Sequence, residues 1–506
     1  MAANDDQADR QPKARPLTGF TLSPSQRKWL WIGLGVLLAL RVLMIFWLPF
    51  TDTTEARYAE IARKMVETGD WITPQFEYGL PFWAKPPLHT WLSAIGMVVF
   101  GVGPFGARIF ILMTALGVLA LLYGWARKER GRDAALIAVA VTTSGALFFV
   151  ASAFVMTDMT MVLGTTAAMV GFHRSVTCKS GGRGWGYVFF VGLAIGLLAK
   201  GPVAVVLTGL PIGLWVLIGN RWRLLGRLPW VSGLALMLVL ALPWYIAAEL
   251  KTPGFLRYFI IGEHYERFVV SGWQGDLYGA GHARAKGTIW IFWLGTFLPW
   301  TLFLVALLAR PKRLIAAVQS DGAGWLSYLT LWVLSPLLLF TPAANILAAY
   351  TLPGLPAAAL LLVTLWGAVF GSPGARVRGL FSAVLVAMMA IYLTLSVLAF
   401  WAPETLNLRS DKRLVEAARH AADDAQLTVW AERSYSAEFY TQGRAQNIAG
   451  DAALGALGVN GVRDAVAVPN ALADRAAAIL GPGFDRIGKF GHNTLFIEQP
   501  AGGESG

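Results

Sequence analysis

The sequence has little charge for its length and almost no cysteine. Only 14% of its 506 residues are charged, whereas soluble proteins carry roughly 25%. A single cysteine, Cys178, excludes an intramolecular disulfide and a cysteine-based metal cluster. Apolar residues make up 56% of the chain, and the mean hydropathy is +0.54. The composition excludes disordered, collagen-like and disulfide-framework proteins and indicates a polytopic membrane protein.

Long apolar segments recur along the chain at the length that a membrane span requires, about 20 residues. About eleven segments qualify, and a pair of short helices also fits in the longer loops. The segments lie near 29–50, 104–126, 134–151, 159–173, 185–199, 201–220, 229–248, 288–309, 324–341, 346–371 and 380–401. The predicted fold class is therefore a polytopic α-helical membrane protein with about 11–13 transmembrane helices.

The net charge of +12 comes mainly from Lys and Arg in short loops between these segments. Basic residues follow the second, fourth, sixth, eighth and tenth segments, which is the positive-inside pattern of membrane proteins and not a nucleic-acid surface. We expect these loops to be cytoplasmic, together with a polar, disordered tail over 1–28 that is not a cleaved signal peptide. The remaining loops, including the long loops 51–103 and 249–287, are then expected on the periplasmic face, and 29–401 forms the transmembrane domain.

Residues 402–506 have the composition of a soluble domain. The segments 427–430, 465–468 and 494–497 are typical of strands, and 412–422 and 470–480 are typical of helices. We predict a small α/β domain on the periplasmic side. No internal repeat is visible, although inverted repeats are common in secondary transporters.

Two carboxylates stand at the start of the first long loop. Apolar residues at helical spacing predict an amphipathic helix over 54–68 that lies on the membrane and ends at Gly69. Asp52 and Glu55 fit a capping box at the start of this helix, with Asp52 as the N-cap. They also fit a pair of functional acids at the bilayer edge. The two interpretations are compatible.

Further charged residues lie close to apolar segments. Lys85, in an aromatic and proline-rich stretch, is either a lysine that snorkels to the interface or an anion ligand. Asp158 is flanked by apolar residues, and Lys200 lies between two spans; such charges are costly unless paired, which makes them functional candidates. Arg41 and Arg108 also lie in or beside spans, with partners that the sequence does not reveal.

The second long loop contains His264 and Arg267, which are three residues apart and so share one face of a helix. One His with one Glu makes a weak metal site. We therefore assign no metal ligand and no cofactor, and a divalent metal requirement stays open. A group of cations at a bilayer surface suits a lipid phosphate, and carboxylates beside it suit acid–base or electrostatic work on a transferred group.

These segments resemble a known family. The runs 55–62, 69–71 and 85–86 are similar to the first outer loop of the bacterial aminoarabinose lipid A transferases, relatives of the protein O-mannosyltransferases in glycosyltransferase family 39. Further similar stretches follow in the same order at 157–159, 199–202, 242–245, 264–268 and 350–353. The resemblance covers roughly 29–400 and implies the membrane-embedded C-type glycosyltransferase fold.

The resemblance implies an inverting transferase in the bacterial inner membrane. Its donor is a sugar on undecaprenyl phosphate, and its acceptor is lipid A or another envelope glycan on the periplasmic face. The donor-phosphate region comprises Arg57, Tyr58, Lys85, Lys200, His264 and Arg267. A lipid phosphate is already a good leaving group, so fixed cations suffice to stabilise its growing charge.

The catalytic candidates are Asp52, Glu55 and Asp158, and Asp158 matches the second carboxylate of the family. The usual first motif is Asp-Glu-x-Arg-Tyr. Here Thr54 stands in the Asp position, Glu55 keeps the Glu position, and Asp52 lies two residues earlier. Ala84 replaces the Glu that often precedes the loop lysine. Which of Asp52 and Glu55 fills the role of the first catalytic acid stays open.

Three other functions fit parts of the pattern. A protein O-glycosyltransferase would use the same fold with a different acceptor. A lipid or sugar transporter, or flippase, would also hold charges at membrane depth, but it predicts broken helices and pseudo-symmetric halves. A non-catalytic envelope-assembly protein would explain Thr54 as a sign of lost chemistry.

Overall fold

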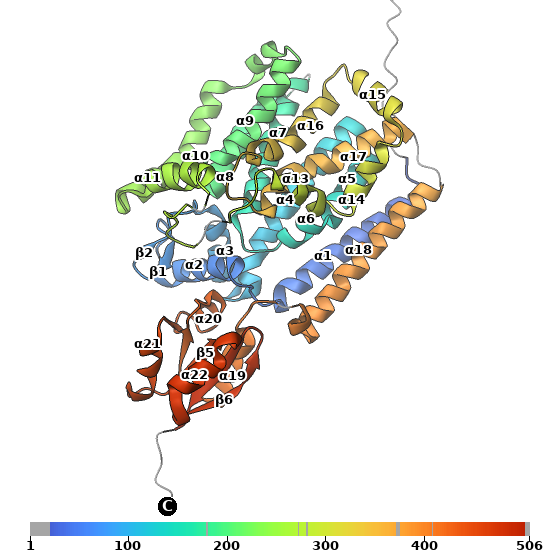
Figure 1. The fold of residues 1–506 in the computed structure, drawn as a ribbon. Helices are drawn as coiled ribbons and strands as arrows, with labels where there is room; N and C mark the ends of the chain where they lie inside the picture. Colours follow the sequence, from blue (N-terminus) through green and yellow to red (C-terminus); the bar gives the residue numbers. More distant parts are fainter. Residues whose placement is uncertain are drawn as a thin grey trace, which may run out of the picture.

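The structure, a computed structural model, describes residues 21–178, 181–271, 273–279, 282–370, 375–406 and 408–500. The predicted N-terminal tail therefore lies largely outside the described residues. A bundle of helices makes up most of the molecule, and a small α/β domain stands at one end of it (Figure 1). Helices α1 and α18 run side by side along one flank of the bundle (Figure 1).

The bundle begins with α1 (Pro24–Trp47), α2 (Thr54–Thr68), the short strands β1 (Gln75–Glu77) and β2 (Leu80–Pro81), α3 (Leu88–Phe100), α4 (Pro104–Arg130), α5 (Arg132–Ser144) and α6 (Ala146–Ala151). It continues with α7 (Thr157–Thr177), α8 (Gly182–Lys200), α9 (Pro202–Ile218), η1 (Trp222–Arg227) and α10 (Trp230–Lys251). The second long loop holds α11 (Phe255–Arg257), the π-helix η2 (Tyr258–Glu266) and α12 (Arg267–Val269). The last part holds α13 (Thr288–Thr296), α14 (Trp300–Leu307), α15 (Pro311–Gln319), α16 (Trp325–Phe340), η3 (Ala348–Gly354), α17 (Leu355–Phe370) and α18 (Ala375–Trp401).

Every predicted span coincides with one or two of these helices. Six helices among the described residues are long and apolar enough to cross a membrane by themselves, and the bent pair α13 and α14 makes a seventh. The axes of that pair differ by 108°, and other segments are shorter apolar helices, such as α9 and α16. The polytopic membrane fold is thus confirmed, while the sequence pattern missed that several segments are broken or short. Helix α3 is an apolar helix that the sequence left inside a loop.

Helices α7 and α8 pack against each other through glycines. A Cβ atom on Gly164 would lie 2.6 Å from the backbone nitrogen of Gly196, and one on Gly192 would lie 2.5 Å from the nitrogen of Ala168. Such close approach is typical of small residues at helix contacts in membranes. Because the two helices are antiparallel neighbours, the start of α7 lies beside the end of α8, which places Asp158 next to Lys200.

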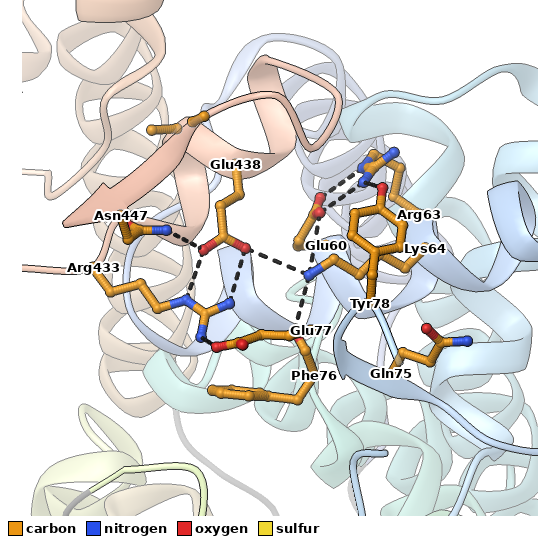
Figure 2. A network of polar contacts seen from close by, with 12 residues as sticks. Glu60, Arg63, Lys64, Gln75, Phe76, Glu77, Tyr78, Arg433, Glu438 and Asn447 are labelled. Atoms are coloured by element: carbon orange, nitrogen blue, oxygen red, sulfur yellow. Dashed lines mark hydrogen bonds and ion pairs between the residues drawn. The ribbon is translucent and has the colours of Figure 1, made fainter. Parts of the chain in front are cut away.

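Helix α2 forms over the predicted residues and ends at Gly69, which adopts the left-handed conformation. The capping-box prediction was wrong: Thr53 is the N-cap, and it makes no side-chain cap bond. The charged side chains of Glu60, Arg63 and Lys64 are buried in the structure. They join a polar network with Phe76 of β1, Tyr78 in the turn that follows it, and Glu438 of the C-terminal domain (Figure 2).

The C-terminal domain is a five-stranded sheet of order β4-β3-β5-β7-β6 with helices on both faces. Its strands are β3 (Gln426–Trp430), β4 (Gln446–Ile448), β5 (Asp464–Pro469), β6 (Phe484–Phe490) and β7 (Asn493–Glu498), and its main helices are α19 (Lys412–Ala421), α20 (Tyr435–Tyr440), α21 (Asp451–Gly455) and α22 (Ala473–Leu480). The three predicted strands and two predicted helices are all present. Strands β4 and β6 are additional, because both are too polar to show an apolar pattern.

Charged side chains join the C-terminal domain to α2 and the β1–β2 hairpin (Figure 2). Glu438 of α20 accepts from Arg433 at 2.6 Å and from Asn447 at 2.8 Å, and it lies 3.5 Å from the ammonium of Lys64. Arg433 reaches Glu77 of β1 at 2.5 Å. This interface fixes the domain against the first long loop, at the end of the bundle where α1 and α18 also end (Figure 1).

Candidate active site

A buried ion pair stands at the junction of α7 and α8. The ammonium of Lys200 lies 2.5 Å from a carboxylate oxygen of Asp158, and both side chains are largely buried. The same ammonium lies 4.5 Å from the ring centre of Tyr350 in η3. Lys200 therefore has one charged partner and one aromatic partner, an arrangement that stabilises a cation in a low-dielectric setting.

A second charged group lies where the first and second long loops meet. Lys85 donates to Glu263 at 2.8 Å and to the carbonyl of Ala84 at 2.7 Å. Arg267 donates to both oxygens of Glu263, at 3.0 and 3.1 Å, and lies 3.3 Å from Asp276. One carboxylate thus holds two cations that come from segments far apart in the sequence.

Glu263 is the most enclosed member of this group, with a side chain only 1% exposed. Burial acts to raise the pKa of its carboxyl, but the neighbouring Lys85 and Arg267 outweigh it and hold the pKa below its ordinary value. Glu263 is therefore an anion at neutral pH. Its role is to fix the two cations, whose side chains remain 18% and 19% exposed.

Tyr350 connects the two groups. It lies within electrostatic range of Lys85, Arg267, Glu263 and Asp158, in addition to its contact with Lys200. The site is thus one cluster of three cations and three carboxylates: Lys85, Lys200, Arg267, Asp158, Glu263 and Asp276. We call it the cation cluster.

Arg57 stands at the edge of the cation cluster. It donates to the carbonyl of Tyr278 at 2.7 Å, and its buried Nε has no hydrogen-bond partner among the described residues. The hydroxyl of Tyr278 accepts from the backbone of Trp83 at 2.9 Å, which ties this segment to the loop that carries Lys85. With Arg57 included, four cations face three carboxylates, so the region has a net charge of +1 before any ligand binds.

Tyr58 and His264 pack against neighbouring aromatic and backbone groups. The Tyr58 ring packs edge-on against His89 at 4.8 Å and Phe82 at 5.9 Å. His264 Nδ1 lies 2.7 Å from the carbonyl of Phe259, and burial lowers the pKa of its imidazole. Within the part of the chain that the structure describes, no three His, Cys, Asp or Glu side chains come together as a metal site would require.

Glu55 lies away from the cation cluster in a different pair. Both of its oxygens accept from Arg108 of α4, at 2.8 and 2.7 Å, and one also accepts from the backbone of Val155 at 3.2 Å. Arg108 in turn donates to the carbonyls of Leu48 and Pro49, at 2.7 and 3.2 Å. This buried pair ties α2, α4 and the end of α1 together.

Asp52 lies at the junction with the C-terminal domain. Its carboxylate accepts from the backbone of Ser436 at 3.1 Å and from the hydroxyls of Ser434 and Ser436. Together with Thr53 it lines a polar cleft of about 590 Å³ whose other lining residues all belong to the C-terminal domain. Burial raises the pKa of Asp52 to about 6, although the serine donors act against this. The three carboxylates expected from the sequence therefore lie in three separate settings.

The sequence analysis missed Glu263, Tyr350 and Asp276. Glu263 lies four residues before Arg267, and that spacing on a helix is a recognisable ion-pair signal. Tyr350 falls in a stretch noted only for its similarity to a family. Nothing in the sequence reveals that Asp276 faces Arg267, because the contact depends on how the second long loop folds.

The fold and the cation cluster together define a polytopic membrane protein of the C-type glycosyltransferase class. Residues 36–259 match the family described as dolichyl-phosphate-mannose-protein mannosyltransferase. The undecaprenyl phosphate-α-4-amino-4-deoxy-L-arabinose arabinosyl transferase of Edwardsiella ictaluri is 30% identical over 73% of this chain and 66% of its own length. The enzyme of the same name from Aeromonas hydrophila is 33% identical over 62% of this chain and 55% of its own length.

Two solved structures share the fold. ArnT from Cupriavidus metallidurans, in a crystal structure with bound undecaprenyl phosphate, superposes with a TM-score of 0.77 at 19% identity and covers 94% of this chain and 98% of that one. The oligosaccharyltransferase of Archaeoglobus fulgidus gives 0.50 at 12% identity over 89% of this chain and 71% of that one. The chain belongs to glycosyltransferase family 39 and is similar to its ArnT-like members. It spans somewhat more than half to about two thirds of the length of the curated relatives that it matches.

Proposed function

We propose that this protein transfers a sugar from undecaprenyl phosphate to lipid A or another envelope glycan. The observation that carries the proposal is the pairing of Lys85 and Arg267 on one buried carboxylate. It presents two partly exposed cations side by side, which suits the phosphate of a polyprenyl-linked donor. The names of the relatives and the undecaprenyl phosphate bound to the similar structure support the same donor.

The proposed reaction is a single displacement. An acceptor oxygen attacks the anomeric carbon, and the bond between that carbon and the phosphate oxygen breaks. Undecaprenyl phosphate leaves, and the configuration at the anomeric carbon is inverted. Lys85 and Arg267 stabilise the charge that grows on the phosphate, and Arg57 with its unpartnered Nε adds a third donor. No strong general acid is required, because the phosphate is already a good leaving group.

Asp158 is the one of the three carboxylates expected from the sequence that lies in the cation cluster. If the acceptor is a sugar hydroxyl, Asp158 is placed to take its proton, with Lys200 holding the carboxylate and the Tyr350 ring packing on the Lys200 ammonium. If the acceptor is a phosphate of lipid A, it arrives ionised, and Asp158 then orients Lys200. We assign Glu55 a structural role and place Asp52 at the contact with the C-terminal domain.

The proposal includes a location. The loops after the second, fourth, sixth, eighth and tenth apolar segments are basic and so would be cytoplasmic. The first long loop, the second long loop and residues 402–506 would then face the periplasm from the inner membrane. These segments share one end of the structure, which supports a common side (Figure 1). We propose that the C-terminal domain helps to dock the acceptor, since it supplies most of the lining of the polar cleft that Asp52 also lines.

Mass spectrometry of lipid A and envelope glycans tests the function. Cells would express the wild type, Lys85→Ala, Asp158→Asn or the control Arg475→Ala at matched membrane levels. Arg475 is 60% exposed in an ion pair of the C-terminal domain. A sugar-sized mass addition with the wild type and control, but not with the other two variants, is the expected result. An addition found on protein acceptors instead would favour the protein O-glycosyltransferase, and no addition anywhere would overturn the enzyme assignment.

A further inference from the structure

Arg41 is a buried cation that the proposed reaction does not use. It lies on α1 and is only 6% exposed. Its guanidinium donates to the hydroxyl of Ser152 at 3.2 Å, to the carbonyl of Val150 at 2.5 Å and, weakly, to the sulfur of Met44 at 3.9 Å. A guanidinium has five N–H donors, so at least two are left without a partner among the described residues.

The charges around Arg41 do not balance. The charged groups that act on it are Arg108 and Glu55. Both oxygens of Glu55 are already occupied by Arg108, so no carboxylate of the described chain pairs with Arg41. Two cations and one anion leave this buried region with a net charge of +1. A charge at membrane depth is costly unless it is paired, so the arrangement calls for one more anion.

An elongated apolar cavity of about 410 Å³ leads away from Arg41 between α1, α4, α5 and α6. Arg41 and Ser152 stand at one end of the cavity, and Trp31 and Tyr123 stand at the other. Residues 31–41 of α1 line it, which corresponds to about 15 Å of helix at the standard rise. Gly35 faces the cavity, and a Cβ atom there would meet no atom within 4 Å.

We propose that this cavity binds one acyl chain of an anionic phospholipid, with the lipid phosphate on Arg41. The long apolar lining suits a hydrocarbon chain and disfavours a free hydrophilic anion. Arg41 lies six residues from Trp47, the last residue of α1, or about 9 Å along the helix. A side chain as long as arginine spans much of that depth toward the headgroup layer. The guanidinium and the Ser152 hydroxyl together offer a phosphate several donors.

This lipid site is separate from the donor site. The proposed donor phosphate lies on Lys85 and Arg267, which come from the loop after β2 and from the second long loop. Arg41 comes from α1 and contacts α6 and the residues that follow it. A bilayer lipid held here would fix α1 against α4 and α6, next to the Glu55–Arg108 pair that anchors α2.

Native mass spectrometry of the full-length purified protein tests the proposal. Delipidated protein would be mixed with equal amounts of phosphatidylglycerol and phosphatidylcholine of the same chain length. We expect the wild type to retain phosphatidylglycerol with at least about tenfold preference, because its net negative charge offsets the charge of +1 around Arg41, whereas the choline cation of phosphatidylcholine already cancels the charge of its own phosphate. Arg41→Gln should abolish the preference, while Arg41→Lys should keep most of it. Lys28→Gln, which removes an exposed cation from the same helix, is the matched control.

A second pair of variants keeps the test independent of any folding defect at Arg41. Gly35→Leu adds a side chain into the cavity and should lower retention of both lipids at least about fivefold, since its Cβ meets no atom within 4 Å and the rest of the side chain takes up cavity space. Gly124→Leu is the control, because Gly124 is exposed on α4 and equally open but lies outside the cavity lining.

Two outcomes would overturn the proposal. The first is equal retention of the anionic and zwitterionic lipids by the wild type, which would reduce the cavity to ordinary lipid contact. The second is stoichiometric displacement of phosphatidylglycerol by undecaprenyl phosphate, lost in Arg41→Gln, which would assign the cavity to the donor. The first outcome leaves the transferase proposal unchanged. The second would move the donor phosphate from Lys85 and Arg267 to Arg41, and the transfer assay with Lys85→Ala and Asp158→Asn tells the two failures apart.

Discussion

Substitutions in the Glu55–Arg108 pair can show whether Glu55 has a structural or a catalytic role. Glu55 fills the acidic position of the family motif, yet its carboxylate is fully engaged by Arg108 and the backbone of Val155. The two side chains are 2% and 3% exposed. Removing one partner of a buried ion pair costs about 3–5 kcal/mol, because the other charge is left unpaired. We therefore expect Glu55→Gln to lower the free energy of unfolding by about that amount.

The assay has a stability part and an activity part. Apparent melting temperature in detergent would be measured for Glu55→Gln, Arg108→Gln and the double variant, and transfer would be measured per folded molecule. The double variant should lose less stability than the sum of the single variants, with a coupling of about 0.5–3 kcal/mol. Glu67→Gln is the control on the same helix, since the Glu67 side chain is 50% exposed and its buried partner Arg63 keeps its ion pair with Glu60.

Transfer per folded molecule should stay within about tenfold of the wild type, which corresponds to 1.4 kcal/mol. A Glu55→Gln protein with unchanged melting temperature and abolished transfer would refute this reasoning. It would also return Glu55 to the catalytic acid role that the family motif implies.

Three further outcomes follow from the same contacts. Gly164→Val should push α7 away from α8, disturb the Asp158–Lys200 pair and reduce transfer more than tenfold. Gly124→Val, at an exposed and open position of α4, is the control and should leave transfer unchanged. Equal activity of the two variants would contradict the proposed packing. The raised pKa of Asp52, about 6 against 3.8, means that its protonated form favours the folded state, so this stability is present below about pH 4 and is lost as the pH rises through 6. Asp52→Asn should therefore stabilise the protein at pH 7 by at most about 3 kcal/mol, which a higher melting temperature would show. The melting temperature of this variant should also depend less on pH between 4 and 6. An unchanged pH profile would count against the buried position of Asp52. Glu438→Gln should loosen the C-terminal domain and speed proteolysis near residues 402–411, because Lys64 and Arg433 lose their shared carboxylate, whereas the exposed control Arg475→Ala should not (Figure 2).

Composition and periodicity were sufficient for the architecture. Apolar length located every long helix, and short apolar runs located strands β3, β5 and β7, because burial of apolar surface imposes both patterns directly. Helix breaks were harder to see. The bend between α13 and α14 and the separation of η3 from α17 depend on packing and on local backbone geometry, which leave hydropathy unchanged.

Several residues of the site could be predicted from the sequence, but which of them contact one another could not. Lys85, Asp158, Lys200 and Arg267 stood out because charges near apolar segments are costly without partners. Their actual partners come from contacts between distant segments, such as Lys85 with Glu263 across the two long loops. Asp52 and Glu55 look equivalent in the sequence, and only the position of the C-terminal domain and of Arg108 separates them.

The most direct test of the account is the affinity for undecaprenyl phosphate in the wild type, Lys85→Ala and the exposed control Lys412→Ala. The Lys412 side chain is 36% exposed and lies in the C-terminal domain. If Lys85 and Arg267 hold the donor phosphate, Lys85→Ala should weaken binding at least about tenfold, the loss of one charge-assisted contact, and Lys412→Ala should not. Equal affinity in all three proteins would contradict the central claim that the cation cluster is the donor-phosphate site.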